Sequence, residues 1–137
     1  VGFMQIKLIP LQAHGDERGS LIALEQDKNI PFPIKRVYYI FDTQEGVTRG
    51  FHAHKELKQV AIAVKGSCRF LLDDGKEKVS FLLDNAAQGL LIESCIWREM
   101  SDFSEDCVLM VLADNFYDES DYIRDYDEFL KIVKDKE

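Results

Sequence analysis

The chain has 137 residues, 46% of them hydrophobic, and a formal net charge of −8 at pH 7. This length suits one domain with a real core, so we expect residues 1–137 to form a single domain. An acidic chain has few cations to place against phosphates or anionic lipid, and we expect neither nucleic acid nor a membrane as a partner. The first ten residues lack the pattern of a secretory signal peptide. Three widely spaced cysteines, Cys68, Cys95 and Cys107, suit the reducing cytoplasm, where we expect the protein to work.

Short β-rich segments separated by turn residues follow one another along most of the chain. The first two strands are predicted on either side of the polar turn HGDERG, which places His14 in an exposed loop. Many short strands without interleaved helices indicate a β-sandwich or barrel. The predicted strands are 5–9, 20–25, 34–42, 59–65, 67–72, 79–83, 90–92, 96–100 and 107–113.

The segment 34–42, IKRVYYIFD, is β-branched and aromatic throughout, which favours a strand packed on both faces. Alternation places Arg36, Tyr38 and Ile40 on one face, and Tyr39 on the other. On this pattern alone, either tyrosine could face a cavity. At the other end of the chain, apolar residues recur at helical spacing over 125–133, with Asp125 and Glu128 placed as a capping box, and predict a short helix packed on the sheets.

Two of the three histidines lie in one stretch, GVTRGFHAHKELKQVAIAVKG, which covers residues 46–66. Because side chains alternate along a strand, His52 and His54 are expected on the same side. The spacing of His52, His54 and Gln59 between two glycines is similar to that of the first cupin motif. This resemblance implies an all-β, cupin-type jelly roll, here with a short C-terminal helix.

Two residues in this frame do not suit a metal. Metal-binding cupins carry a glutamate where this chain has Gln59, and a histidine where the segment IWREM has Arg98. An arginine stays protonated at physiological pH and repels a divalent cation held beside it. We therefore expect no bound metal, and no other cofactor.

An imidazole titrates near neutral pH, so either histidine can carry a proton without a metal. The alternative is that both rings are ordinary packed, hydrogen-bonded strand residues. The neighbouring residues favour a cavity wall over a packed core, because the charged Arg49 and Lys55 flank the pair and Gly50 and Ala53 add little bulk.

Three motifs, RGFHAHKELKQ, IWREM and VLADNFYDESDYIRDYDEFL, resemble the nucleotide-sugar 3,4-ketoisomerases of the WxcM-like cupins over nearly the whole chain. The resemblance implies a homodimer that moves the keto group of dTDP-4-keto-6-deoxy-D-glucose from C4 to C3 without metal, supplying a sugar for amination at C3. It marks His52 and His54 as the catalytic pair, with Tyr38 and Arg49 in the same pocket. The pair Arg18 and Gly19 resembles the branch that gives the galacto product.

Two other functions stay open on the sequence alone: a non-catalytic sugar-nucleotide-binding cupin and a metal-dependent cupin dioxygenase. The histidine pair argues against the first, because binding does not need two titrating groups on one face. Gln59 and Arg98 argue against the second. For substrate binding we predict Tyr38, Arg49 and Arg98, and we expect the diphosphate to contact some subset of the basic residues nearest the motif, which are Arg49, Lys55, Lys58, Arg69 and Arg98.

Overall fold

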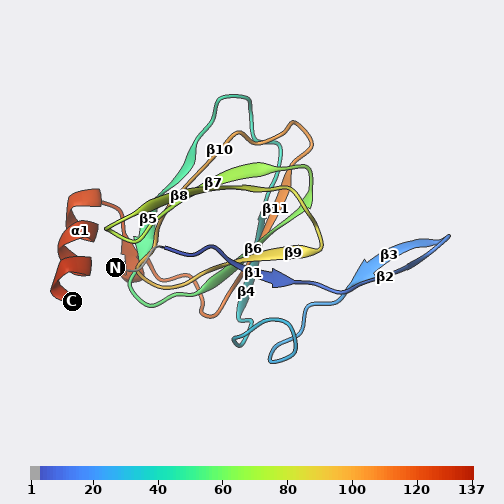
Figure 1. The fold of residues 1–137 in the computed structure, drawn as a ribbon, viewed down its shortest axis with the longest axis horizontal. Helices are drawn as coiled ribbons and strands as arrows, with labels where there is room; N and C mark the ends of the chain where they lie inside the picture. Colours follow the sequence, from blue (N-terminus) through green and yellow to red (C-terminus); the bar gives the residue numbers. More distant parts are fainter. Residues whose placement is uncertain (1–3) are drawn as a thin grey trace.

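The computed structural model describes residues 4–137, and Figure 1 shows two facing β-sheets with a projecting hairpin and a terminal helix at opposite ends. All strand pairs in both sheets are antiparallel. In order across it, the first sheet contains β1 (Lys7–Pro10), β9 (Gln88–Ile92), β6 (Gln59–Lys65), β11 (Val108–Ala113) and β4 (Arg36–Ile40). The second contains β12 (Tyr122–Ile123), β5 (Arg49–His54), β10 (Trp97–Ser101), β7 (Cys68–Asp73) and β8 (Lys78–Leu83).

This topology confirms the predicted all-β jelly roll with a short C-terminal helix. Strands distant in sequence lie side by side: β6 runs between β9 and β11, and β10 runs between β5 and β7. The largest core fills the space between the sheets with buried side chains such as Phe70, Leu90 and Leu109. The sandwich thereby fixes the positions of the side chains that point inward from both sheets.

The edge strand β4 differs from its prediction. Tyr38 faces inward and packs against the core, as alternation allowed. The opposite face is not covered within this chain, because Val37 is 51% exposed, Tyr39 63% and the following Phe41 56%. The expectation of a strand packed on both faces is therefore wrong for the isolated chain.

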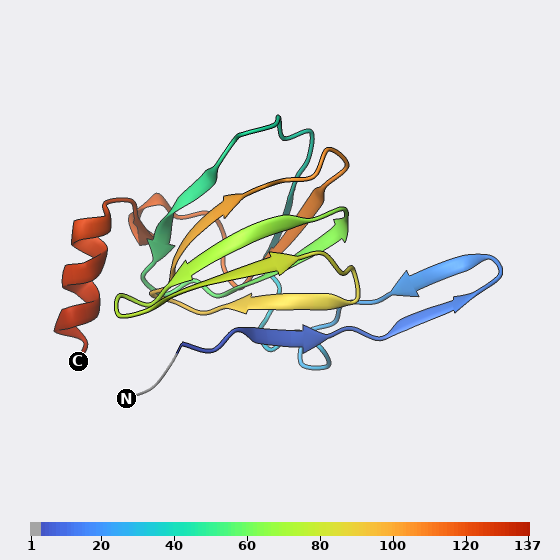
Figure 2. The same cartoon turned by 45° about the horizontal axis from the view of Figure 1, so that its top comes forward.

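The polar segment after β1 is also more ordered than predicted. Where a turn was predicted over 14–19, the chain forms β2 (Ala13–Asp16). This strand pairs in a hairpin with β3 (Gly19–Ile22), which overlaps the predicted strand 20–25, and Glu17 and Arg18 lie at the tip. His14 thus lies on a strand, although it is exposed as expected. Figure 2 shows this hairpin extending well away from the two sheets.

The chain ends in α1 (Tyr126–Asp135), preceded by a 3-10 turn, η1 (Glu119–Asp121), and β12. Asp125 caps α1 by accepting a hydrogen bond from the amide of Asp127 at 3.1 Å. Phe129 is fully buried and packs with Trp97, Ala53 and Ile123 in a second core that attaches the helix to the end of the sandwich. Within residues 4–137, no helix is long and apolar enough to cross a membrane.

We predict that Phe129→Ala lowers the free energy of unfolding by about 3–5 kcal/mol, because it removes a buried ring and leaves a cavity. Phe116→Ala is the matched control, since Phe116 is 66% exposed and should change stability by less than about 0.5 kcal/mol. Urea unfolding at pH 7 measures both values. Equal effects of the two substitutions would contradict the role of Phe129 in attaching α1.

Candidate active site

The site begins where β5 and β10 approach each other closely. Gly50 has φ of +94°, and the β5–β10 register shifts between Arg98 and Glu99. A Cβ at Gly50 would lie 2.8 Å from the carbonyl oxygen of Arg98, so only glycine tolerates both this conformation and this approach. The resulting register pairs His52 with Arg98 across the two strands.

The two histidines share one side of β5, as alternation predicts. Their ring centroids are 5.1 Å apart and the rings are nearly perpendicular. Tyr122 on β12 packs against both rings, at 5.0 Å from His52 and 4.3 Å from His54. His52 is half-buried and His54 is buried.

Asp121, at the end of η1, determines which nitrogen of His54 carries the proton. One carboxylate oxygen of Asp121 lies 3.2 Å from His54 Nδ1, and the same carboxylate accepts hydrogen bonds from the amides of Glu56 at 3.0 Å and Leu57 at 3.3 Å. A carboxylate facing these donors is an acceptor, so Nδ1 of His54 is the protonated nitrogen. Nε2 of His54 is buried, and it has no hydrogen-bond partner among residues 4–137. This nitrogen is therefore the free acceptor.

Both imidazoles are held neutral. Burial, followed by the positive charge of Arg98, lowers the pKa of His52 to about 4 and that of His54 to about 2. A neutral ring near pH 7 has a lone pair ready to accept a proton. Each ring therefore has an unprotonated nitrogen at pH 7 and can accept a proton, although its lowered pKa makes it a weaker base than a free imidazole.

Arg98 starts a buried hydrogen-bond chain that crosses from one sheet to the other. Its side chain is 2% exposed, and its guanidinium donates to Gln59 Oε1 and to the carbonyl of Ile96. Gln59 in turn donates from Nε2 to the hydroxyl of Tyr38 at 3.1 Å. Burial lowers the pKa of Arg98 to about 10, so it stays a cation at pH 7. Burial raises the pKa of Tyr38, which keeps its phenol protonated.

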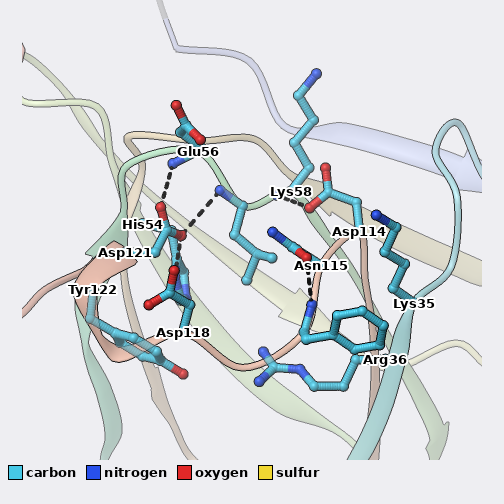
Figure 3. A pocket seen from close by; sticks show the side chains of 12 residues that line it. Lys35, Arg36, His54, Glu56, Lys58, Asp114, Asn115, Asp118, Asp121 and Tyr122 are labelled. Atoms are coloured by element: carbon cyan, nitrogen blue, oxygen red, sulfur yellow. Dashed lines mark hydrogen bonds and ion pairs between the residues drawn. The ribbon is translucent and has the colours of Figure 1, made fainter.

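A cavity of about 390 Å³ opens beside His54 and Tyr122. Figure 3 shows the carboxylates of Glu56, Asp118 and Asp121 on one side, and on the other Lys35, Arg36 and Lys58 together with the carboxylate of Asp114. The guanidinium of Arg36 lies 5.3 Å from the centroid of the Tyr38 ring and links this cavity to the buried chain. The lining residues are Lys35, Arg36, His54, Glu56, Leu57, Lys58, Asp114, Asn115, Phe116, Asp118, Asp121 and Tyr122.

The basic residues singled out from sequence lie in different places. Lys58 lines the cavity, whereas Arg98 is buried beside the histidines. Arg49 is exposed at the start of β5, three residues before His52. Arg69 lies on β7, where it contacts Ser80 and pairs with Asp102 at 3.5 Å, and is not among the residues that line the cavity.

Several residues of this site were not identified from sequence. Arg36 had a usable signal, because alternation already placed it on the face of Tyr38. Asp121 and Tyr122 had only their place in the motif DYIRDYDEFL, and nothing local connects them to histidines some 67 residues earlier. Within the described part of the chain, no three His, Cys, Asp or Glu side chains are grouped closely enough to hold a metal ion.

The histidine pKa values predict a pH-dependent stability. A neutral buried histidine resists protonation in the folded state, so stability is full above the unfolded pKa of about 6.5 and falls as pH decreases toward the folded values. We expect a loss of up to about 2 kcal/mol per histidine between pH 7 and pH 5. Urea unfolding of a His52→Asn/His54→Asn double variant should show a flatter profile. His14→Asn, on the exposed hairpin, is the control and should keep the pH profile of the parent. An unchanged pH profile in the double variant would contradict the lowered pKa values of His52 and His54.

Comparison with known proteins places the chain in a family. Residues 4–134 match the family model described as WxcM-like, C-terminal (FdtA). The chain is 55% identical over 130 residues to a TDP-4-oxo-6-deoxy-alpha-D-glucose-3,4-oxoisomerase of Aneurinibacillus thermoaerophilus, covering 95% of this chain and 94% of that protein. A 3,4-ketoisomerase from Helicobacter canadensis has a similar structure, with a TM-score of 0.92, 52% identity and coverage of 96% of this chain and 99% of the other. A variant of the 3,4-ketoisomerase QdtA from Thermoanaerobacterium thermosaccharolyticum, in complex with TDP-4-keto-6-deoxyglucose, gives a TM-score of 0.95 at 41% identity and covers 98% of each chain. The chain belongs to the WxcM-like family of sugar 3,4-ketoisomerases.

Proposed function

We propose that this protein is an isomerase that converts dTDP-4-keto-6-deoxy-D-glucose into the corresponding 3-keto sugar. The observation that carries the proposal is the pair of neutral imidazoles on one face of β5, next to a buried guanidinium and a phenol. Family membership supports the substrate, because the named relatives act on or bind this sugar nucleotide. The product is a suitable substrate for an amination at C3.

The reaction requires two proton movements and no change in the overall composition of the sugar. The proton on C3 is acidic because it lies beside the C4 carbonyl, and its removal gives an enediolate spanning C3 and C4. Reprotonation at C4 and movement of the hydroxyl proton from O3 to O4 complete the exchange. Two separate proton carriers on one wall, one for the carbons and one for the oxygens, can perform these steps.

The geometry supports a specific division of roles. We assign the carbon base to His52, to which the family resemblance points; its ring is half-buried and lies 5.1 Å from that of His54, which lines the cavity. We assign the proton transfer between the oxygens to His54, whose Nε2 is the free nitrogen because Asp121 occupies Nδ1. Tyr38 donates a hydrogen bond to the oxyanion that develops on the sugar, since preorganised donors act most strongly where charge appears.

Cations on one side of the cavity support binding of the diphosphate, although the carboxylates of Glu56, Asp114, Asp118 and Asp121 line the same cavity. Lys35, Arg36 and Lys58 all line it, and cations of this kind offset phosphate charge. Arg49 and Arg98 remain in the proposed substrate-binding set. The positive charge of Arg98 lowers the pKa of His52, and Arg49 is exposed at the start of β5. We propose that no metal takes part, because Gln59 stands where a metal site would carry an anionic carboxylate and the cation Arg98 stands where it would carry a neutral imidazole.

A test follows the sugar by NMR after the protein is mixed with dTDP-4-keto-6-deoxy-D-glucose in the presence of a chelator. We expect a 3-keto product. The resemblance carried by Arg18 predicts the galacto form, whose equatorial H4 couples weakly to H5, whereas the gluco form couples strongly. No conversion, with the nucleotide sugar still bound, would favour the alternative of a non-catalytic binding protein. Activity that a chelator abolishes and a stoichiometric divalent ion restores would favour metal dependence.

We predict that His52→Asn lowers kcat by at least about 10²-fold, which is the lower end of the usual contribution of a general acid or base. The loss for His54→Asn should be similar or smaller. Asparagine keeps a hydrogen-bonding head of similar reach, so nucleotide-sugar binding should be largely retained in both. Exchange of the C3 proton with solvent deuterium identifies the carbon base: exchange at the parent rate in His52→Asn would show that His52 is not that base.

We also propose that the protein is a cytoplasmic homodimer with one domain, residues 1–137, in each copy. Two features of the described chain support the second copy. The outer face of β4 presents Val37, Tyr39 and Phe41 to solvent, and exposed apolar stripes on edge strands invite pairing with another chain. The β2–β3 hairpin projects alone, with Leu21 62% exposed, and isolated hairpins are marginally stable in water.

Light scattering should therefore give twice the 15.8 kDa mass of the chain at micromolar concentration. Tyr39→Asp should shift the equilibrium toward monomer, because it places a charge on the proposed interface. Leu82→Asp is the matched control, since Leu82 is also exposed but lies on β8 in the other sheet. A parent protein that scatters as 15.8 kDa would contradict the dimer.

A further inference from the structure

Gln59 sits at the centre of the buried hydrogen-bond chain, and its amide has one possible orientation. The side chain is 2% exposed. Arg98 only donates hydrogen bonds, so the atom of Gln59 that faces its guanidinium must be the carbonyl oxygen. The amide nitrogen is then the atom that faces Tyr38, at 3.1 Å from the hydroxyl oxygen. Arg98 thus fixes the orientation of the Gln59 amide.

The direction of this bond determines where the Tyr38 proton goes. A phenol can accept one hydrogen bond and donate another. Because Tyr38 accepts from Gln59 Nε2, its own hydrogen must point to a different acceptor. Every donor–acceptor step from Arg98 through Gln59 therefore runs toward Tyr38, and each bond in such a chain polarises the next.

We propose that Gln59 is a positioning residue that makes Tyr38 a hydrogen-bond donor to the oxygen of the sugar on which negative charge develops. This inference rests on the proposed ketoisomerase function and explains a residue that this function leaves without a role. Gln59 acts through Tyr38 and need not touch the substrate itself. The Tyr38 hydroxyl is held beside Arg98, so the donated bond lies in the positive field of the guanidinium.

A glutamate at position 59 would reverse the direction of the hydrogen bond between this side chain and Tyr38. A carboxylate accepts hydrogen bonds and does not donate them, so it would accept from Arg98 and also from Tyr38. The phenol hydrogen would then point at the carboxylate and away from the sugar. The negative charge would also oppose an oxyanion forming nearby. The neutral amide of Gln59 accepts at one end and donates at the other.

The test compares five proteins: the parent, Gln59→Glu, Gln59→Met, Tyr38→Phe and the double variant Gln59→Met/Tyr38→Phe. Gln59→Glu has nearly the same shape and keeps a partner for buried Arg98, so it should fold, which circular dichroism and urea unfolding check. We expect kcat to fall by about 10²-fold or more in Tyr38→Phe, the usual effect of removing one oxyanion donor. Gln59→Glu should lower kcat at least tenfold, with the dissociation constant for dTDP changed by less than about threefold.

The double variant separates positioning from a general effect of the substitution. Gln59→Met alone should lower kcat about tenfold. If Gln59 acts through Tyr38, adding Gln59→Met to Tyr38→Phe should change kcat by less than about twofold, because the effects of coupled residues are not additive. Gln59→Glu with parental kcat, or a full additional loss of kcat when Gln59→Met is added to Tyr38→Phe, would overturn the inference. A parent protein that does not isomerise the sugar would instead overturn the proposed function, so the two failures are distinguishable.

Discussion

The arrangement of the site depends on one buried cation. Arg98 is 2% exposed, and a charge removed from water needs partners that replace its hydration. Gln59 and the carbonyl of Ile96 provide them from within the sandwich. The same charge acts together with burial to keep His52 and His54 neutral. Hydrogen-bond direction and imidazole protonation therefore share a common origin in this guanidinium.

The position of that cation is itself a backbone property. Arg98 lies opposite His52 because β5 and β10 come together at Gly50, where a side chain would collide with the Arg98 carbonyl. The bulge at Arg98 and Glu99 shifts the register in the same place, and bulges are a frequent means of redirecting side chains near active sites. A substitution at Gly50 would thus affect the chemistry without any change in a titrating residue.

Sequence patterns predicted the parts of this molecule that depend on local chemistry. Alternation correctly placed both histidines on one side of β5 and put Tyr38 and Tyr39 on opposite faces of β4 without showing which face is the inner one, and turn residues located most strands. The contact of Asp121 with His54 joins residues 67 positions apart and arises from the return of the chain as β12, which no local pattern specifies. The exposed face of β4 was not predicted for a different reason. An apolar strand has the same sequence pattern whether its second face packs against its own chain or against another chain.

The two halves of the site differ in how firmly the fold holds them. The groups assigned to chemistry, Tyr38, His52, His54, Gln59 and Arg98, all lie on strands within the hydrogen-bonded sheets. Much of the cavity wall, including Lys58, Asp114 and Phe116, comes from segments between strands. Loops accept sequence change more readily than the sheets that they connect. Changes in nucleotide or sugar preference can therefore arise in these loops while the proton carriers and the donor chain that supports them stay in place.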